Sequence, residues 1–155
     1  MRTLIIAALS LAAAAHLSAV ELPSKFLGTW SGTVTFDTEG EAMAQKTTTT
    51  YKKNGKSGYI VTTIIKARGI TAKGITYYYK SGKLSGELKR DGAVIAVASG
   101  TWSVSKNTLK EDVRVKGMFP SYRTVSKATL TSSNRLSVSD KSDSGERSSG
   151  VLTRK

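Results

Sequence analysis

The segment FLGTWSGTVTF, residues 26–36, alternates apolar or small residues with mostly polar ones along its whole length. One face of this segment would carry Phe26, Gly28, Trp30, Gly32, Val34 and Phe36. The opposite face would carry Leu27, Thr29, Ser31, Thr33 and Thr35. A period of two residues is typical of a strand, because successive side chains of a strand point to opposite faces of the sheet. The segment therefore predicts an antiparallel strand with one buried and one solvated face.

Residues 93–104 repeat this pattern and predict a second strand of the same kind. The face expected to be buried would carry Val94, Ala96, Ala98, Gly100, Trp102 and Val104. Small residues on a buried face suit strands that bend sharply, as the wall of a small barrel must. Small inward residues, here Gly32, Gly86, Ala96, Ala98 and Ala128, could also leave space inside such a barrel.

Turn signals recur between the alternating runs, and the best of them are Asn54-Gly55 and Asp91-Gly92. They delimit ten candidate strands at 26–36, 41–52, 57–67, 70–80, 83–90, 93–104, 108–116, 122–132, 135–140 and 146–154. An open meander of this size would leave two long edges with unpaired backbone groups, and closure removes those edges. We therefore predict one all-β domain over residues 20–155, a closed antiparallel up-and-down barrel of about 8–10 strands.

Residues 1–19 have the features of a cleaved secretory signal peptide. Arg2 gives a positive start, residues 4–17 form a mostly apolar run, and Leu-Ser-Ala at 17–19 offers a small-residue cleavage site. The alternative is a transmembrane anchor, which needs about 20 apolar residues, and this run is shorter. We expect a periplasmic or secreted protein without a transmembrane segment.

Composition excludes several chemistries. The chain has no cysteine, and its one histidine, His16, lies within the predicted signal. The remaining chain therefore has no disulfide, no histidine-based acid–base pair and none of the usual zinc ligand sets. We predict no metal site, no cofactor and no enzymatic activity.

The chain is strongly basic. It has 24 Lys and Arg against 11 Asp and Glu, a net charge of +13, and loss of Arg2 with the signal leaves +12. Such a surplus indicates attraction to polyanions, to an anionic surface or to an acidic partner. The basic residues are spaced singly along the candidate strands, so a generally well-solvated surface explains the same charge.

The two ends of the predicted barrel resemble the calycin superfamily, which includes the lipocalins and lipocalin-like small bacterial barrels. The resemblance rests on Gly28-Thr29-Trp30 at the start of the first strand and on Arg154 near the end of the last. It implies that Gly28, Trp30 and Arg154 close one end of the barrel, with the arginine packed across the tryptophan. A cation–π contact of this kind contributes about 1–2 kcal/mol when it is desolvated.

One carboxylate is a candidate site residue. Glu111 would lie on the same strand face as Leu109, Val113 and Val115, so it would point into the barrel. An inward carboxylate is costly without a partner and could orient a ligand. The alternative is that Glu111 lies near the rim or pairs with an arginine.

Four tyrosines are further candidates for the lumen or its mouth: Tyr59, Tyr77, Tyr79 and Tyr122. Tyr77 and Tyr79 share one strand face, and Tyr78 lies on the other. Tyrosine offers an apolar body and a hydroxyl, although strand tyrosines are also common as packing residues.

The calycin resemblance implies a function in binding. The first hypothesis is an exported, non-enzymatic barrel that holds a small apolar or amphipathic ligand in its lumen. The second is a basic envelope or interaction protein whose outer surface binds polyanions or an acidic protein partner.

Overall fold

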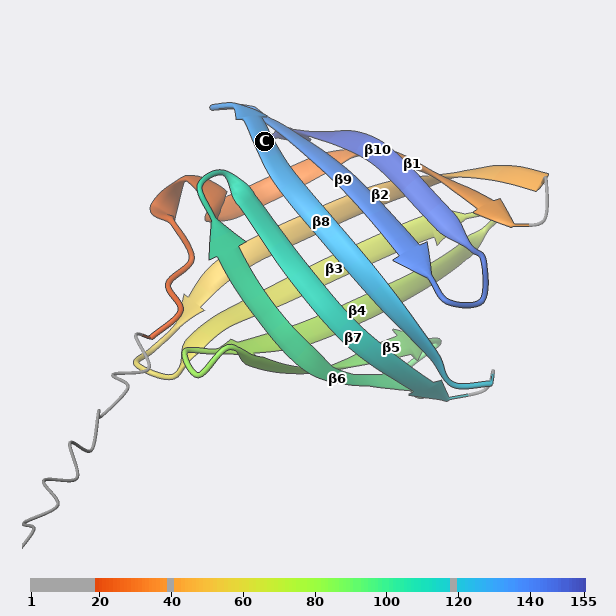
Figure 1. Cartoon of the computed structure of the whole chain (residues 1–155). Helices are drawn as coiled ribbons and strands as arrows, with labels where there is room; N and C mark the ends of the chain where they lie inside the picture. Colours follow the sequence, from red (N-terminus) through yellow and green to blue (C-terminus); the bar gives the residue numbers. More distant parts are fainter. Residues whose placement is uncertain (1–18, 39–40, 118–119) are drawn as a thin grey trace, which may run out of the picture.

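Ten antiparallel strands follow one another around a closed barrel in the computed structural model, which describes residues 19–38, 41–117 and 120–155 (Figure 1). Each strand pairs with its neighbours along the chain, and β1 also pairs with β10 to close the sheet. The strands are β1 Gly28–Thr38, β2 Glu41–Asn54, β3 Gly58–Ala67, β4 Ile70–Tyr79, β5 Lys83–Arg90, β6 Ala93–Ser105, β7 Thr108–Gly117, β8 Tyr122–Ser132, β9 Arg135–Ser142 and β10 Arg147–Arg154. The predicted fold class is confirmed, and every predicted strand ends within two residues of its expected position.

The predicted turn chemistry is present where the strands reverse. Arg68, Asp91 and Lys106 have positive φ values of 47°, 51° and 54°. Each lies in a short connection where paired strands must reverse without splaying, and the mirror-image turns that match strand twist require such backbone angles. These tight connections hold consecutive strands in register around the barrel.

One part of the predicted alternation is wrong, because β6 contains a bulge. Leu88 lies opposite Ala96, but Lys89 lies opposite Val94, so Ile95 has no partner in β5. Beyond an extra residue of this kind, each side chain of the strand points to the opposite face from the one that simple alternation predicts. Val94 therefore lies outside, with 50 % of its surface exposed, and not in the lumen as predicted.

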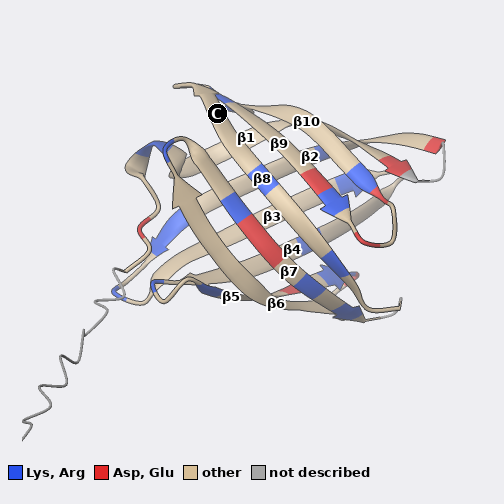
Figure 2. Ribbon diagram, in the orientation of Figure 1, with Lys and Arg blue, Asp and Glu red and all other residues tan. Residues whose placement is uncertain are grey.

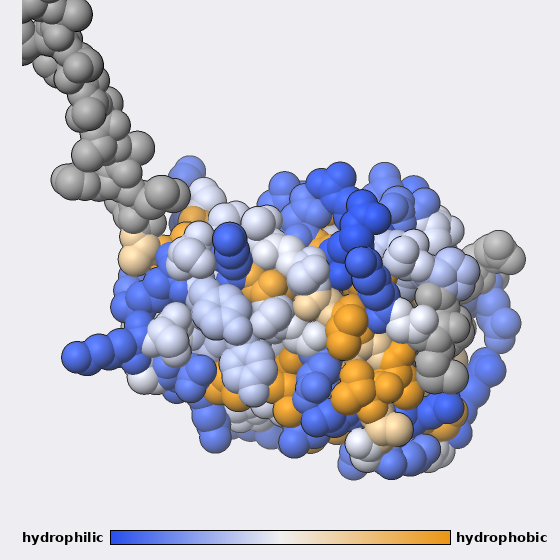
Figure 3. Space-filling model, turned by 90° about the horizontal axis from the view of Figure 1, so that it is seen from below, coloured by the Kyte–Doolittle hydropathy of each residue, from blue (hydrophilic) through white to orange (hydrophobic). Residues whose placement is uncertain are grey.

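Apolar side chains gather on the outer face of the barrel seen from below in Figure 3. Among the exposed large hydrophobic residues are Val94 and Val97 on β6 and Tyr77 and Tyr79 on β4. The outer face is therefore not uniformly polar.

The segment before β1 covers one end of the barrel. It contains the 3₁₀ turn η1, Ser24–Phe26. The Val20 amide donates to the Lys80 carbonyl over 2.8 Å, and Leu22 and Phe26 are buried. Residues 1–18 of the predicted signal peptide lie outside the described residues.

Trp30 and Arg154 lie together at this covered end. Trp30 is fully buried, and its indole nitrogen donates to the Phe26 carbonyl over 2.9 Å. The Arg154 guanidinium carbon lies 4.4 Å from the centre of the tryptophan ring, and the same guanidinium donates to the Leu27 carbonyl over 2.8 Å. A Cβ on Gly28 would meet a guanidinium nitrogen at 3.0 Å. Gly28, Trp30 and Arg154 thus lie in contact at the covered end of the barrel.

Basic residues occur along most of the strands and are not confined to one end of the barrel (Figure 2). Within the described residues, no helix is long and apolar enough to cross a membrane.

Candidate functional site

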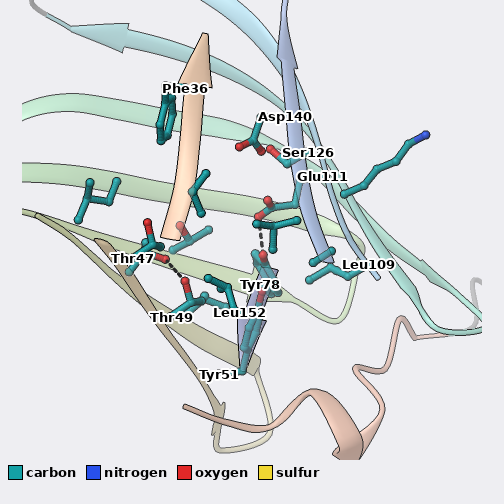
Figure 4. A pocket seen from close by; sticks show the side chains of 18 residues that line it. Phe36, Thr47, Thr49, Tyr51, Tyr78, Leu109, Glu111, Ser126, Asp140 and Leu152 are labelled. Carbon is teal, nitrogen blue, oxygen red and sulfur yellow. Dashed lines mark hydrogen bonds between the residues drawn. The ribbon is translucent and has the colours of Figure 1, made fainter. Parts of the chain in front are cut away.

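The barrel encloses a cavity of about 210 Å³, and many of the side chains that line it are polar (Figure 4). The polar lining includes Thr47, Thr49, Tyr51, Tyr78, Glu111 and Asp140. A packed barrel core is usually filled by apolar side chains. Free space into which a few polar groups project from an otherwise apolar wall is instead a feature of ligand-binding sites.

Glu111, Ser126 and Asp140 form one row across the inner wall. Glu111 on β7 lies opposite Ser126 on β8, and Ser126 lies opposite Asp140 on β9. Neighbouring strands are about 4.8 Å apart, so the Cα atoms of the two acids are separated by about 10 Å. Because the wall is concave, both carboxylates face the same cavity (Figure 4).

Glu111 accepts a hydrogen bond from the Tyr78 hydroxyl across the lumen. Burial raises the pKa of Glu111, the Tyr78 bond opposes that rise, and the negative charge of Asp140 adds to it. Burial and the Glu111 charge also raise the pKa of Tyr78 well above its ordinary value, so this phenol stays protonated and acts as a donor. Glu111 therefore lies inside the barrel without an arginine partner, in contrast to the rim alternative.

The Glu111 pKa predicts how stability changes with pH. Because the folded-state pKa is raised above its ordinary value of 4.5, the folded protein binds this proton more tightly than the unfolded chain. Stability should therefore fall as pH rises through the folded-state pKa. We expect Glu111→Gln to be more stable than the parent protein at pH 7, with the difference vanishing below pH 4.5 in urea titrations.

Asp112→Asn is the control for this prediction, because Asp112 is the next residue but points outward. Its hydrogen bond from Arg123 lowers the pKa of Asp112, so the sign is reversed. This variant should be slightly less stable than the parent at neutral pH, since exposed pairs contribute little. A Glu111→Gln variant that loses stability at pH 7 would show that the ionised carboxylate stabilises the fold.

A second cavity, of about 230 Å³, adjoins the first and is more apolar. Thr76 lines both, so the two compartments meet at β4. The lining of the second includes Gly86, Leu88, Ala96, Ala98, Val115 and Tyr122. Tyr122 is thus the one tyrosine of the four candidates that lines either compartment.

The other three candidate tyrosines do not line the cavities. Tyr59 is buried, but its hydroxyl donates to Glu21 at the covered end and its ring packs edge-on against Trp102. Tyr77 and Tyr79 are 38 % and 41 % exposed on the outer face, so the prediction that they line the lumen is wrong. Tyr78 between them is the inward residue, and its ring stacks on Trp102 at 5.0 Å.

Sequence reasoning missed Tyr51, Tyr78 and Asp140. The sequence did contain a signal for Tyr78. Lys73, Tyr77 and Tyr79 lie on one face of the strand, and a lysine in mid-strand points to solvent. Tyr78, on the other face, should therefore point inward. Asp140 had a signal of the same kind, because it alternates in step with the apolar Leu136 and Val138, whereas Lys141 lies on the other face of that strand. Within the described residues, no three His, Cys, Asp or Glu side chains are grouped as a metal site would require.

The chain forms a closed ten-stranded antiparallel barrel with an internal cavity, and its fold resembles that of a solved structure. The crystal structure of Rv2717c from M. tuberculosis matches with a TM-score of 0.62 at 14 % identity, over 87 % of this chain and 99 % of that one. This similarity shows the fold alone.

Two redesigned β-barrels also match, each with a TM-score of 0.43. One matches at 17 % identity, over 89 % of this chain and 98 % of its own. The other, mFAP1 bound to DFHBI, matches at 16 % identity, over 84 % of this chain and 96 % of its own. No protein-family model and no curated protein sequence matches this chain.

Proposed function

We propose that this protein is an exported, non-enzymatic binding barrel of the calycin type, which holds a small amphipathic ligand in its lumen. The observation that carries the proposal is the pair of adjoining cavities, one lined by carboxylates and hydroxyls and the other by aliphatic side chains. A ligand with a polar and an apolar part would satisfy both linings. The periplasm or the extracellular space is the proposed location.

Binding without turnover is the simpler role for these groups. Tyr78 and Glu111 form a donor–acceptor pair, and the raised pKa of Tyr78 keeps its proton in place at neutral pH. Such a pair can orient a ligand, but a phenol that holds its proton is a poor general base.

A cavity-filling variant tests the proposal. Ala98 lines the apolar compartment, and Ser99 beside it is exposed on the outer face. We expect a solvatochromic dye to bind the parent protein and Ser99→Phe alike and to be displaced by amphipathic compounds. Ala98→Phe should lose dye binding at least tenfold while it remains folded by circular dichroism.

Two results of this experiment would count against a ligand in the lumen. One is equal dye binding by Ala98→Phe and the parent protein, which would place the dye on the outer surface. The other is an absence of displacement by chemically diverse amphipathic compounds.

A second candidate function places binding on the outside, and the register of the sheet favours it. Directly opposed on neighbouring strands are five pairs of basic residues: Lys46 with Lys66, Lys73 with Lys89, Lys110 with Lys127, Arg114 with Arg123, and Lys141 with Arg147. Like charges directly opposite each other destabilise a sheet, and among the described residues ion pairs with Glu87 and Asp112 relieve this repulsion only at Lys89 and Arg123. A polyanion bound across such pairs would offset that cost.

The pair Lys46 and Lys66 allows a sharp test. Lys46→Gln with Lys66→Gln should reduce the salt dependence of retention on a sulfated polyanion matrix by about two contacts. The same variant should be slightly more stable than the parent protein, because the repulsion is removed. Lys52→Gln with Lys83→Gln is the control of equal charge. An equal loss of retention in both variants would mean that net charge alone explains the attraction.

A further inference from the structure

The two inward carboxylates have no cationic partner in the described part of the chain. Among the described residues, the ion pairs use Glu21, Glu41, Glu87, Asp91 and Asp112. Glu111 and Asp140 instead accept hydrogen bonds from neutral hydroxyls, those of Tyr78 and Ser148.

One basic residue, Lys127, borders the polar cavity. It is exposed, and it lies opposite Lys110 and Ser139 on the outer face, between the inward residues Ser126 and Ala128. Its ammonium group therefore points away from the lumen. The polar compartment carries negative charge that nothing else in its described lining compensates, and such charge is costly in a partly desolvated site.

Two hydroxyl groups in the same compartment have no hydrogen-bond partner among the described residues. Tyr51 is 6 % exposed and Thr47 is 8 % exposed, and both line the cavity. Every fully buried side-chain nitrogen or oxygen in the described part of the chain has a partner, so these hydroxyls reach the free space.

Tyr51 lines the same cavity as both acids. Besides burial, the charges of Glu111 and Asp140 raise its pKa. The cavity therefore offers two carboxylates and two free hydroxyl oxygens, and each of these groups can accept hydrogen bonds.

We propose that the lumen selects ligands that carry a protonated amine, which lies between Glu111 and Asp140 while the apolar body of the ligand extends past Thr76 into the aliphatic compartment. This inference rests on the proposed function and names the ligand class. An ammonium group has three N–H donors and no acceptor, which matches this set of acceptors. Its hydrogen bonds to carboxylates are charge-assisted and are about twice as strong as neutral ones.

The positive outer surface opposes the approach of a cation, but the local carboxylates prevail at the site. Surface charges are screened over about 8 Å at physiological ionic strength, whereas contacts inside a partly buried cavity are screened much less. A ligand carboxylate would meet the opposite situation, because it would be attracted to the surface and repelled by Glu111 and Asp140 in the lumen.

Three compounds of equal chain length test the selectivity: n-octylamine, n-octanol and n-octanoate. Protein-detected NMR titrations of the full protein at pH 7 give both the affinity and the resonances that shift. We expect octylamine to bind at least tenfold more tightly than octanol, octanoate to bind most weakly in the lumen, and the largest shifts to fall on β7 and β9.

Matched variants separate the charges from the cavity. Glu111→Gln with Asp140→Asn should abolish the preference for the amine and leave octanol binding within about twofold, since both amides keep the size of the acids. Asp112→Asn, on the outer face beside Glu111, should bind all three compounds as the parent protein does.

The outcomes distinguish this inference from the proposed function. If octanol or octanoate binds the lumen as tightly as the amine, or if the double variant keeps the amine preference, the inference is wrong and a binding barrel remains. If none of the three compounds shifts resonances of inward residues, both the inference and the proposed function are wrong.

Discussion

Trp30→Ala is expected to lower the free energy of unfolding by about 3–5 kcal/mol, the range observed for removal of a large buried aromatic side chain. Trp30 is fully buried at the covered end of the barrel. The substitution would leave a cavity beneath Arg154, whose guanidinium stacks on the indole at 4.4 Å. It would also remove the indole donor that satisfies the Phe26 carbonyl. Chemical denaturation followed by circular dichroism measures the loss.

Two further variants separate the contributions to this loss of stability. Trp30→Phe keeps much of the volume but removes the indole hydrogen bond, so it should cost less than the alanine substitution. Arg154→Met keeps an aliphatic stem over the ring but removes the cation and its hydrogen bonds to the Leu27 and Ser133 carbonyls, and these losses together should cost about 1–2 kcal/mol. Unchanged stability in Trp30→Ala would mean that this end of the barrel does not depend on the tryptophan.

The strands and their order follow from the sequence because two local signals agree. Alternation with a period of two marks each strand, and residues that tolerate positive φ, such as Asp91 and Gly92, mark the reversals. Closure follows from the same information, since ten sequential strands leave two edges that can satisfy each other. The covering of one end by residues 20–27 has no such periodic signal.

The facing of individual strands is less predictable, and β4 illustrates why. Tyr77, Tyr78 and Tyr79 are consecutive, so hydrophobicity alone cannot tell which face is inward. The polar inner residue Thr76 hides the pattern further, because the lumen is itself polar. Only Lys73, on the outer face with Tyr77 and Tyr79, distinguishes the two faces.

The bulge in β6 is a second reason why the predicted facing of some residues was wrong. It depends on how β5 and β6 pair around Ile95, which is a non-local property, and nothing in the alternation of residues 93–104 reveals it. The polar row of Glu111, Ser126 and Asp140 is non-local for the same reason, since three strands must be placed in register before those residues become neighbours.

Gly58→Ala is expected to lower the free energy of unfolding by about 3 kcal/mol or more. Gly58 begins β3 with a φ of +143°, in the region that favours glycine, and strain of this kind costs about 1–3 kcal/mol for other residues. A Cβ there would lie 1.9 Å from the Tyr78 carbonyl oxygen, so β3 and β4 would have to move apart. That movement would disturb the strand that places Tyr78 against Glu111, and it adds lost ladder hydrogen bonds to the strain.

Gly55→Ala is the matched control, because it lies in the same hairpin with a φ of +57° but has no atom within 4 Å of a new Cβ. Its free energy of unfolding should fall only by the cost of a left-handed backbone conformation, about 1–2 kcal/mol. The difference between the two variants in urea denaturation isolates the steric part. A movement of β4 should also change the pH dependence of stability, because a displaced Tyr78 phenol would weaken its hydrogen bond to Glu111. Equal destabilisation by both substitutions would show that β4 yields to the added methyl group and that the close approach at Gly58 carries no structural cost.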